Sequence, residues 1–135
     1  MEDATFLFVK ISSPKGVDFY KEHLEIIKKY GYVDFCRIGK RKINTSRFSD
    51  KLFIKDSVRN GGKLYEAKLS EQSGKNQFPT YYKKSDKEKS TIIRICSLEE
   101  VELAKINEEY CAISGKSIVD VVRASVPSFY ITRRK

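Results

Sequence analysis

The sequence predicts an α+β fold in which a small mixed β-barrel has helices packed on its outside. Short segments rich in β-branched and aromatic residues, the composition of strands, outnumber the stretches with helical periodicity. Two of these segments are joined by Asn60, Gly61 and Gly62, which suit the positive φ angles of a tight antiparallel hairpin. With 135 residues, 40% of them hydrophobic, the chain is long enough to enclose one core. We therefore treat residues 1–135 as a single domain.

The first half of the chain is expected to form one helix and four strands. Residues 5–11, TFLFVKI, predict a buried first strand because they are β-branched and aromatic. A helix is predicted over 17–30, with Gly31 placed to end it. Its apolar residues recur at three- and four-residue steps: Val17, Tyr20, Leu24 and Ile27. The further strands are expected at 32–38, 51–56 and 64–70.

The second half is expected to contain a strand at 91–97 that runs directly into a helix. Ser97, followed three residues later by Glu100, forms a capping box and predicts the start of a helix over 98–113. Gly115 can end this helix. The remaining elements expected are a short helix at 117–124 and a strand at 128–132.

A long polar segment separates the fourth expected strand from the fifth. Residues 71–90 lack periodicity but carry three aromatic residues, Phe78, Tyr81 and Tyr82. A loop of this length in a small domain is usually functional or disordered. We interpret the aromatic residues as binding residues; the alternative is that they fold back onto the sheet edge.

The chain is strongly basic, which favours a polyanionic partner. Its 27 Lys and Arg residues against 18 Asp and Glu give a net charge of +9 and a pI near 9.4. Five basic residues crowd the connector between the second and third expected strands: Arg37, Lys40, Arg41, Lys42 and Arg47. We interpret them as phosphate-binding residues, with a solvated basic loop as the alternative.

The sequence argues against a membrane protein and against a metal site. No apolar run approaches the roughly 20 residues that span a bilayer, and the acidic start MEDATF is no signal peptide. Cys36, Cys96 and Cys111 are too widely spaced for a zinc motif and are expected to be reduced thiols of a cytoplasmic protein. His23, the single histidine, is expected at a solvated helix position. We therefore expect no metal and no cofactor.

The order and spacing of several short motifs resemble the EVE and YTH domains of the PUA-like superfamily of small β-barrels. The opening FLFVK, followed by Ile11 and Ser12, is similar to the WLVKSEP segment of EVE domains. The segment FCRIGKR is similar to their WDGVRN segment, and Phe35 with Cys36 to the WCS of YTH domains. LYEAKL at 64–69 is similar to the GVAEV of both families, and SLEE to a late EVE helix. The resemblance covers about residues 5–113.

This resemblance implies a nucleic-acid-binding domain and not an enzyme. Its ligand would be a base, often a modified one, that leaves its stack and is held between aromatic rings. The residues implied for this base pocket are Phe35, Cys36, Phe78, Tyr81, Tyr82, Lys10 and Ser12. Related domains serve as the recognition part of modification-dependent restriction systems. Both DNA and RNA stay open as ligands, as does whether the chain is whole or part of a longer chain or complex.

Two other function classes have some support in the sequence. Asp56 and the Glu66-Ala67-Lys68 stretch are similar to the carboxylates and lysine of PD-(D/E)xK metal-dependent nucleases. The ordinary interpretation of an alternating Glu and Lys face is the wet side of a hairpin. A protein-interaction or inhibitor module is the other class, supported by the edge strand at 128–132 and its basic tail.

Overall fold

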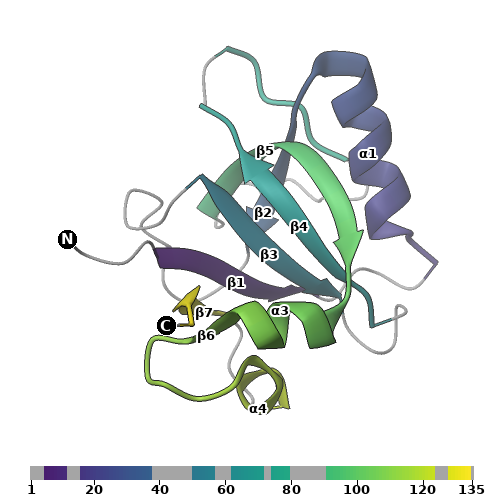
Figure 1. Ribbon diagram of the computed structural model, residues 1–135. Coiled ribbons are helices and arrows are strands. Elements are labelled where there is room, and N and C mark those ends of the chain that lie inside the picture. The colour runs from purple at the N-terminus through teal and green to yellow at the C-terminus, as the bar shows by residue number, and fades with distance from the viewer. Residues whose placement is uncertain are drawn as a thin grey trace.

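A computed structural model of the chain describes residues 5–11, 16–37, 50–56, 62–71, 74–79, 91–123 and 128–134. Within these residues, seven strands form one sheet in the order β2-β5-β4-β3-β1-β7-β6 (Figure 1). Their bounds are β1 Thr5–Ile11, β2 Val33–Arg37, β3 Lys51–Asp56, β4 Leu64–Leu69, β5 Thr91–Val101, β6 Tyr110–Ala112 and β7 Ser128–Arg133. The β1–β3 pair is parallel and the other five pairs are antiparallel. The α+β class is confirmed, but the described strands form an open sheet, so closure into a barrel is not shown.

Helices cover both faces of this sheet. On the first face, α1 (Phe19–Tyr30) packs over a core that includes Val9, Phe35 and Ile54. On the second face, α3 (Leu103–Glu109) and α4 (Ile118–Arg123) pack over a core that includes Phe8 and Phe53. Figure 1 shows α1 at the upper right and α3 and α4 at the bottom. Successive residues of a strand point to opposite faces, which is how the strands supply both cores at once.

The ends of α1 follow the local signals of the sequence. The side chain of Asp18 accepts a hydrogen bond from the backbone N–H of Lys21 at 3.1 Å, as an N-cap does. Gly31 adopts a left-handed conformation with φ of 88°, and its N–H donates to the carbonyl of Ile27 at 2.7 Å. The prediction that Gly31 ends the helix is confirmed. The helix begins at Phe19, two residues later than predicted, because the cap lies at Asp18.

The buried side of α1 overlaps the predicted one, since Tyr20 and Ile27 pack against the core, but it also includes His23. Phe19 and His23, four residues apart, are the buried residues of this helix, while Leu24 is only half-buried. The prediction of a solvated His23 is therefore wrong: its side chain is 0% exposed. Its ring lies 4.0 Å from the ring of Phe19 and 6.3 Å from that of Phe35, between centroids. A histidine does not count as apolar in a periodicity, so the predicted stripe did not include it.

The capping box at Ser97 is not used, so the predicted helix over 98–113 is wrong in its bounds. β5 continues to Val101, and its pairing with β4 runs from Leu64 opposite Val101 to Leu69 opposite Ile95. The pairing register shifts between Lys68 and Leu69, as it does at a β-bulge. The Ser97 hydroxyl accepts the N–H of Lys68 at 3.3 Å, so it contacts the sheet in place of a helix start. Ladder hydrogen bonds to β4 outcompete a local helix signal here.

The other elements lie close to their predicted ranges. β1 and β3 match them, and β2, β4, α4 and β7 differ by one residue at one or both ends. β6, which follows α3 and pairs with β7, was not predicted from the sequence. The predicted turn at 60–62 lies partly outside the described residues, but β3 and β4 pair antiparallel as a hairpin requires. No helix in the described part of the chain is long and apolar enough to cross a membrane.

Candidate nucleic-acid interface

The strand directions bring the two segments singled out in the sequence to one edge of the sheet. β1, β3, β5 and β6 begin at this edge, and β2, β4 and β7 end there. The connector 38–50 runs between the end of β2 and the start of β3, and the segment 70–90 between the end of β4 and the start of β5. Both segments therefore leave and return at the same edge, which we call the basic edge. In Figure 1, β1 and β3 begin near the labels of both termini.

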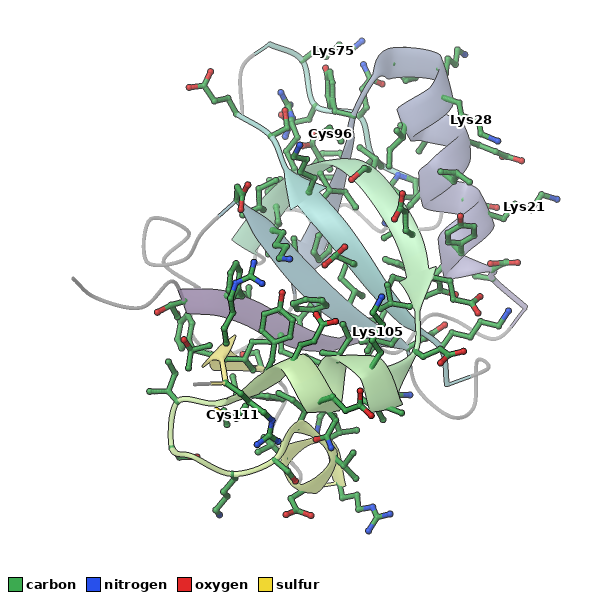
Figure 2. All side chains as sticks on the ribbon, viewed as in Figure 1. Lys21, Lys28, Lys75, Cys96, Lys105 and Cys111 are labelled. Atoms are coloured by element: carbon green, nitrogen blue, oxygen red, sulfur yellow. The ribbon has the colours of Figure 1, made fainter. Side chains whose placement is uncertain are left out.

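The described part of the chain brings cationic side chains to the basic edge from three strands and from the segment that follows β4. These residues are Lys51 at the start of β3, Lys68 near the end of β4, Lys75 beyond it, and Arg133 and Arg134 at the end of β7. All but Lys51 are exposed. Figure 2 shows Lys75 at the top of the view, on the segment that follows β4. The connector 38–50 adds four basic residues, Lys40, Arg41, Lys42 and Arg47, and one acidic residue, Asp50, and Arg37 directly precedes it. This is the charge pattern that attracts phosphates.

Two of these cations lie over the same pair of buried rings. The Nζ of Lys51 lies 5.3 Å from the ring centre of Phe6 and 5.5 Å from that of Tyr110. The guanidinium carbon of Arg133 lies 5.5 Å and 5.4 Å from the same two centres. The two charges are therefore less than about 11 Å apart, which is close to one Debye length at 0.1 M salt. Cation–π attraction holds like charges together at this edge.

Lys51 and Arg133 differ in how much of their charge is available. Lys51 is half-buried and forms an ion pair with Glu66 at 3.2 Å. Burial alone would lower the pKa of Lys51, but hydrogen bonds to Tyr110 and Glu66 outweigh it and raise that pKa. Lys51 thus stays protonated but is largely neutralised by Glu66. Arg133 is exposed, and its guanidinium is the group of this pair that faces solvent.

A buried ion pair fastens the start of the aromatic segment to β2. Arg94 on β5 contacts Asp34 on β2 twice, from Nε to Oδ1 at 2.8 Å and from Nη2 to Oδ2 at 3.1 Å. Both side chains are nearly inaccessible, at 2% and 0%. The ring of Tyr32 stacks on the guanidinium at 4.0 Å. The hydrogen bonds and charge of Asp34 raise the pKa of Arg94 against the effect of burial.

The same pair holds the backbone of residues 71–77. Gln77 exchanges two bonds with Asp34, donating its N–H to Oδ2 at 2.9 Å and accepting the Asp34 N–H at 2.8 Å. The Tyr32 hydroxyl donates to the carbonyl of Lys75. Arg94 also lies 3.4 Å from the carbonyls of Glu71 and Lys75. This network fixes the residue that directly precedes Phe78, which is half-buried.

The structure does not bring the predicted base pocket together around Phe35. Phe35 is 0% exposed and belongs to the core of the first face. Lys10 points to the second face, and three strands separate β1 from β2. Phe35 and Lys10 therefore cannot line one pocket, and a base would not reach Phe35 without displacing core residues. The alternation of residues along β2 predicts that one face of the strand is buried. It does not predict whether Phe35 lies on that face or at the surface.

Most of the other predicted site residues lie outside the part of the chain that the structure describes. Cys36 and Arg37 lie in β2, at its outer end, with side chains that are not described. The residues outside the described part are Ser12, Lys40, Arg41, Lys42, Arg47, Tyr81 and Tyr82. Phe78 has a described side chain and follows Gln77, which binds Asp34 three positions before β2 ends at the basic edge.

The nuclease alternative loses its geometric basis. In the β3–β4 register, Phe53 lies opposite Glu66 and Ile54 opposite Tyr65. Asp56 therefore shares a face with Ile54 and Tyr65, while Glu66 points to the other face. The two carboxylates cannot hold a common cation through the sheet. The described residues contain no group of three His, Cys, Asp or Glu that could hold a metal.

Sequence reasoning missed the two best-defined features of this edge. Arg94 and Asp34 are 60 positions apart, and each alternates with apolar strand residues, which is typical of a wet face. The Lys51 and Arg133 arrangement depends on β7 pairing with β1 in register. Comparison of this chain with family models, curated proteins and solved structures found no match.

Proposed function

We propose that this protein binds nucleic acid along the basic edge. The observation that supports the proposal most is the strand order, which attaches both ends of the basic connector and of the aromatic segment to one edge. Basic side chains beside aromatic faces are the two components of sequence-tolerant recognition of a single strand. Lys and Arg pair with phosphates, and each pairing displaces a counterion.

The predicted phosphate-binding residues and the aromatic residues of the segment 71–90 have distinct roles in this proposal. Phosphates would be held by Arg133 and Arg134 together with the connector residues Arg37, Lys40, Arg41, Lys42 and Arg47. A base would stack on aromatic residues of the segment that Asp34 and Arg94 fasten, namely Phe78, Tyr81 or Tyr82. Phe35 supports the sheet from within and makes no contact with the base. This revises the pocket that the family resemblance implies.

A finer form of the proposal follows from the EVE and YTH resemblance. The base would be a modified one, and the protein would serve as the recognition domain of a modification-dependent restriction system. Binding should then favour one member of a panel of plain, methyl-adenine and modified-cytosine oligonucleotides, in DNA and RNA form. Equal affinity across the panel would reject base readout and leave the phosphate contacts standing.

Replacing Arg133 by Gln should reduce the salt dependence of nucleic-acid binding. Loss of one phosphate contact lowers the slope of log K against log salt by about 0.7 for a single strand. The measurement is fluorescence anisotropy with a random single-stranded oligonucleotide at several salt concentrations. The control is Lys28→Gln, since Lys28 projects from α1 away from the sheet (Figure 2).

Three outcomes separate the possibilities. A lower slope for Arg133→Gln with an unchanged slope for Lys28→Gln supports the interface at the basic edge. Equal slopes in both variants and the unaltered protein would move the interface elsewhere. Absence of salt-sensitive binding by the unaltered protein would reject the function and favour a protein-interaction module. Substitution of Lys40, Lys42 and Arg41 together by Ala extends the same test to the connector.

A further inference from the structure

A second group of aromatic and basic side chains lies where α1 ends and β2 begins. Tyr30, the last residue of α1, is 45% exposed and is one of two large hydrophobic side chains at the surface of the described residues. The Nζ of Lys29 lies 5.2 Å from the centre of its ring. Tyr32 follows after the left-handed Gly31, so the Cα atoms of the two tyrosines are at most about 7.2 Å apart. The turn after α1 therefore brings two tyrosines close together.

Two contacts hold the ring of Tyr32 in place. One face of the ring stacks on the guanidinium of Arg94, whose central carbon lies 4.0 Å from the ring centre. The hydroxyl donates to the carbonyl of Lys75 at the surface of the protein. Tyr32 is half-buried, so part of the residue stays accessible to solvent. A ring that is already ordered loses little side-chain entropy when a ligand stacks on it.

Lys75 supplies the available positive charge beside these rings. Its side chain is exposed, and its carbonyl accepts from the Tyr32 hydroxyl, which places the residue next to that ring (Figure 2). The charge of Arg94 is neutralised by Asp34, and Lys29 lies over the ring of Tyr30. An exposed cation next to aromatic rings suits a nucleotide, because a nucleotide combines a phosphate with a flat base.

This surface is separate from the basic edge but connected to it by the chain. β2 runs from Val33 to Arg37, where it ends at the basic edge, so Tyr32 lies about 17 Å from that edge at about 3.3 Å per residue. The segment that leaves β4 at the basic edge reaches Tyr32 at Lys75. One extended polymer can therefore contact both places, whereas a single nucleotide is too short.

We propose that Tyr30 and Tyr32 form a stacking surface for unpaired bases of the nucleic acid that the basic edge binds, with Lys75 pairing with an adjoining phosphate. This inference rests on the proposed function and adds that the bound form is a single strand. In a duplex the bases stack on one another, so their faces do not reach these rings. Stacking on a tyrosine requires only a flat base, so the surface accepts many sequences.

An abasic strand separates stacking from phosphate binding. It carries as many phosphates as a base-containing strand of equal length but has no base to stack. Fluorescence anisotropy measures the affinity for both strands and for a duplex, with the unaltered protein and with Tyr30→Leu, Tyr32→Leu and Tyr32→Phe. Tyr32→Phe keeps the ring over the guanidinium of Arg94 and removes only the hydroxyl. The control is Ile113→Ala, since Ile113 is the other exposed large hydrophobic residue and follows β6, at the opposite side of the sheet from β2.

We expect Tyr30→Leu and Tyr32→Leu each to weaken binding of the base-containing strand by at least about fivefold, the low end of the contribution of one stacked base. Neither variant should change the affinity for the abasic strand or for the duplex. Tyr32→Phe and Ile113→Ala should bind all three ligands like the unaltered protein. Lys75→Gln should lower the slope of log K against log salt by about 0.7 for both single strands.

The possible failures are distinguishable. If both Leu variants bind the base-containing strand as the unaltered protein does, the stacking surface is overturned while the basic edge stands. If Tyr32→Leu weakens both strands alike and Tyr30→Leu has no effect, Tyr32 has a structural role only, and the inference is again overturned. If the unaltered protein binds neither strand, the proposed function is rejected and this inference with it.

Discussion

Replacing Asp34 by Asn should destabilise the protein by about 3–5 kcal/mol, the usual effect of removing one partner of a buried ion pair. Asn keeps the shape of the side chain but leaves the guanidinium of Arg94, only 2% exposed, without its carboxylate. Arg does not lose its proton in proteins, so the charge cannot be avoided. The carbonyls of Glu71 and Lys75, 3.4 Å away, replace little of the loss. Equilibrium unfolding in urea measures the change.

An exposed ion pair of the same protein provides the control. Lys63 and Glu100 lie 3.2 Å apart with side chains 58% and 56% exposed. Glu100→Gln should change stability by less than about 1 kcal/mol because water screens this pair. Joint replacement of Asp34 by Leu and Arg94 by Met should recover much of the loss, since no buried charge remains. A loss below about 1 kcal/mol for Asp34→Asn would show that water reaches the guanidinium.

Asp34→Asn should also loosen residues 74–79, which links the core to the proposed interface. The N–H of Gln77 donates to the carboxylate of Asp34, so its hydrogen exchange reports on this attachment. Faster exchange at Gln77 with unchanged exchange in α4 would show local release. If the segment orients the aromatic residues that follow it, base stacking should weaken in this variant while the salt slope stays the same.

How much of the fold the sequence could predict depended on whether local and long-range preferences agreed. TFLFVKI and KLFIKD are strands both by composition and by their pairing in the sheet, and the predicted ranges match β1 and β3. At Ser97 the two preferences conflicted. The capping box is a local signal, whereas the ladder between β4 and β5 depends on residues about 30 positions away. Local signals cannot report such pairing.

Only the types of residue in the candidate site could be predicted from the sequence, and not their arrangement in space. The basic connector and the aromatic segment are evident from the residues, but their meeting at one edge depends on the order β2-β5-β4-β3. The same order separates Phe35 from Lys10 by three strands, and the side chain of Phe35 lies in the core of the first face. Charge and aromaticity therefore indicated the type of ligand, while strand order decides which residues can reach it.

Stability should fall by about 2 kcal/mol between pH 7 and pH 5 because of His23 alone. Burial lowers the pKa of His23 from 6.5 to about 4, and the hydrogen bond to Phe19 offsets part of that effect. A carbonyl can only accept, so the 2.9 Å contact with the Phe19 carbonyl places the proton of the neutral ring on Nδ1. Charging the ring would introduce a cation beside Phe19 and Phe35, where the side chain is 0% exposed.

The sign of the effect follows from which state takes up the proton first. As pH falls through 6.5 the unfolded chain binds a proton at His23, while the folded protein does so only near pH 4. The stability from the neutral ring is therefore complete above pH 6.5 and declines until about pH 4. Urea unfolding at half-unit pH steps should show this decline in the unaltered protein and its absence in His23→Leu. With one histidine in the chain, no other imidazole contributes in this range. An equal decline in His23→Leu would assign the pH dependence to carboxylates and contradict the prediction.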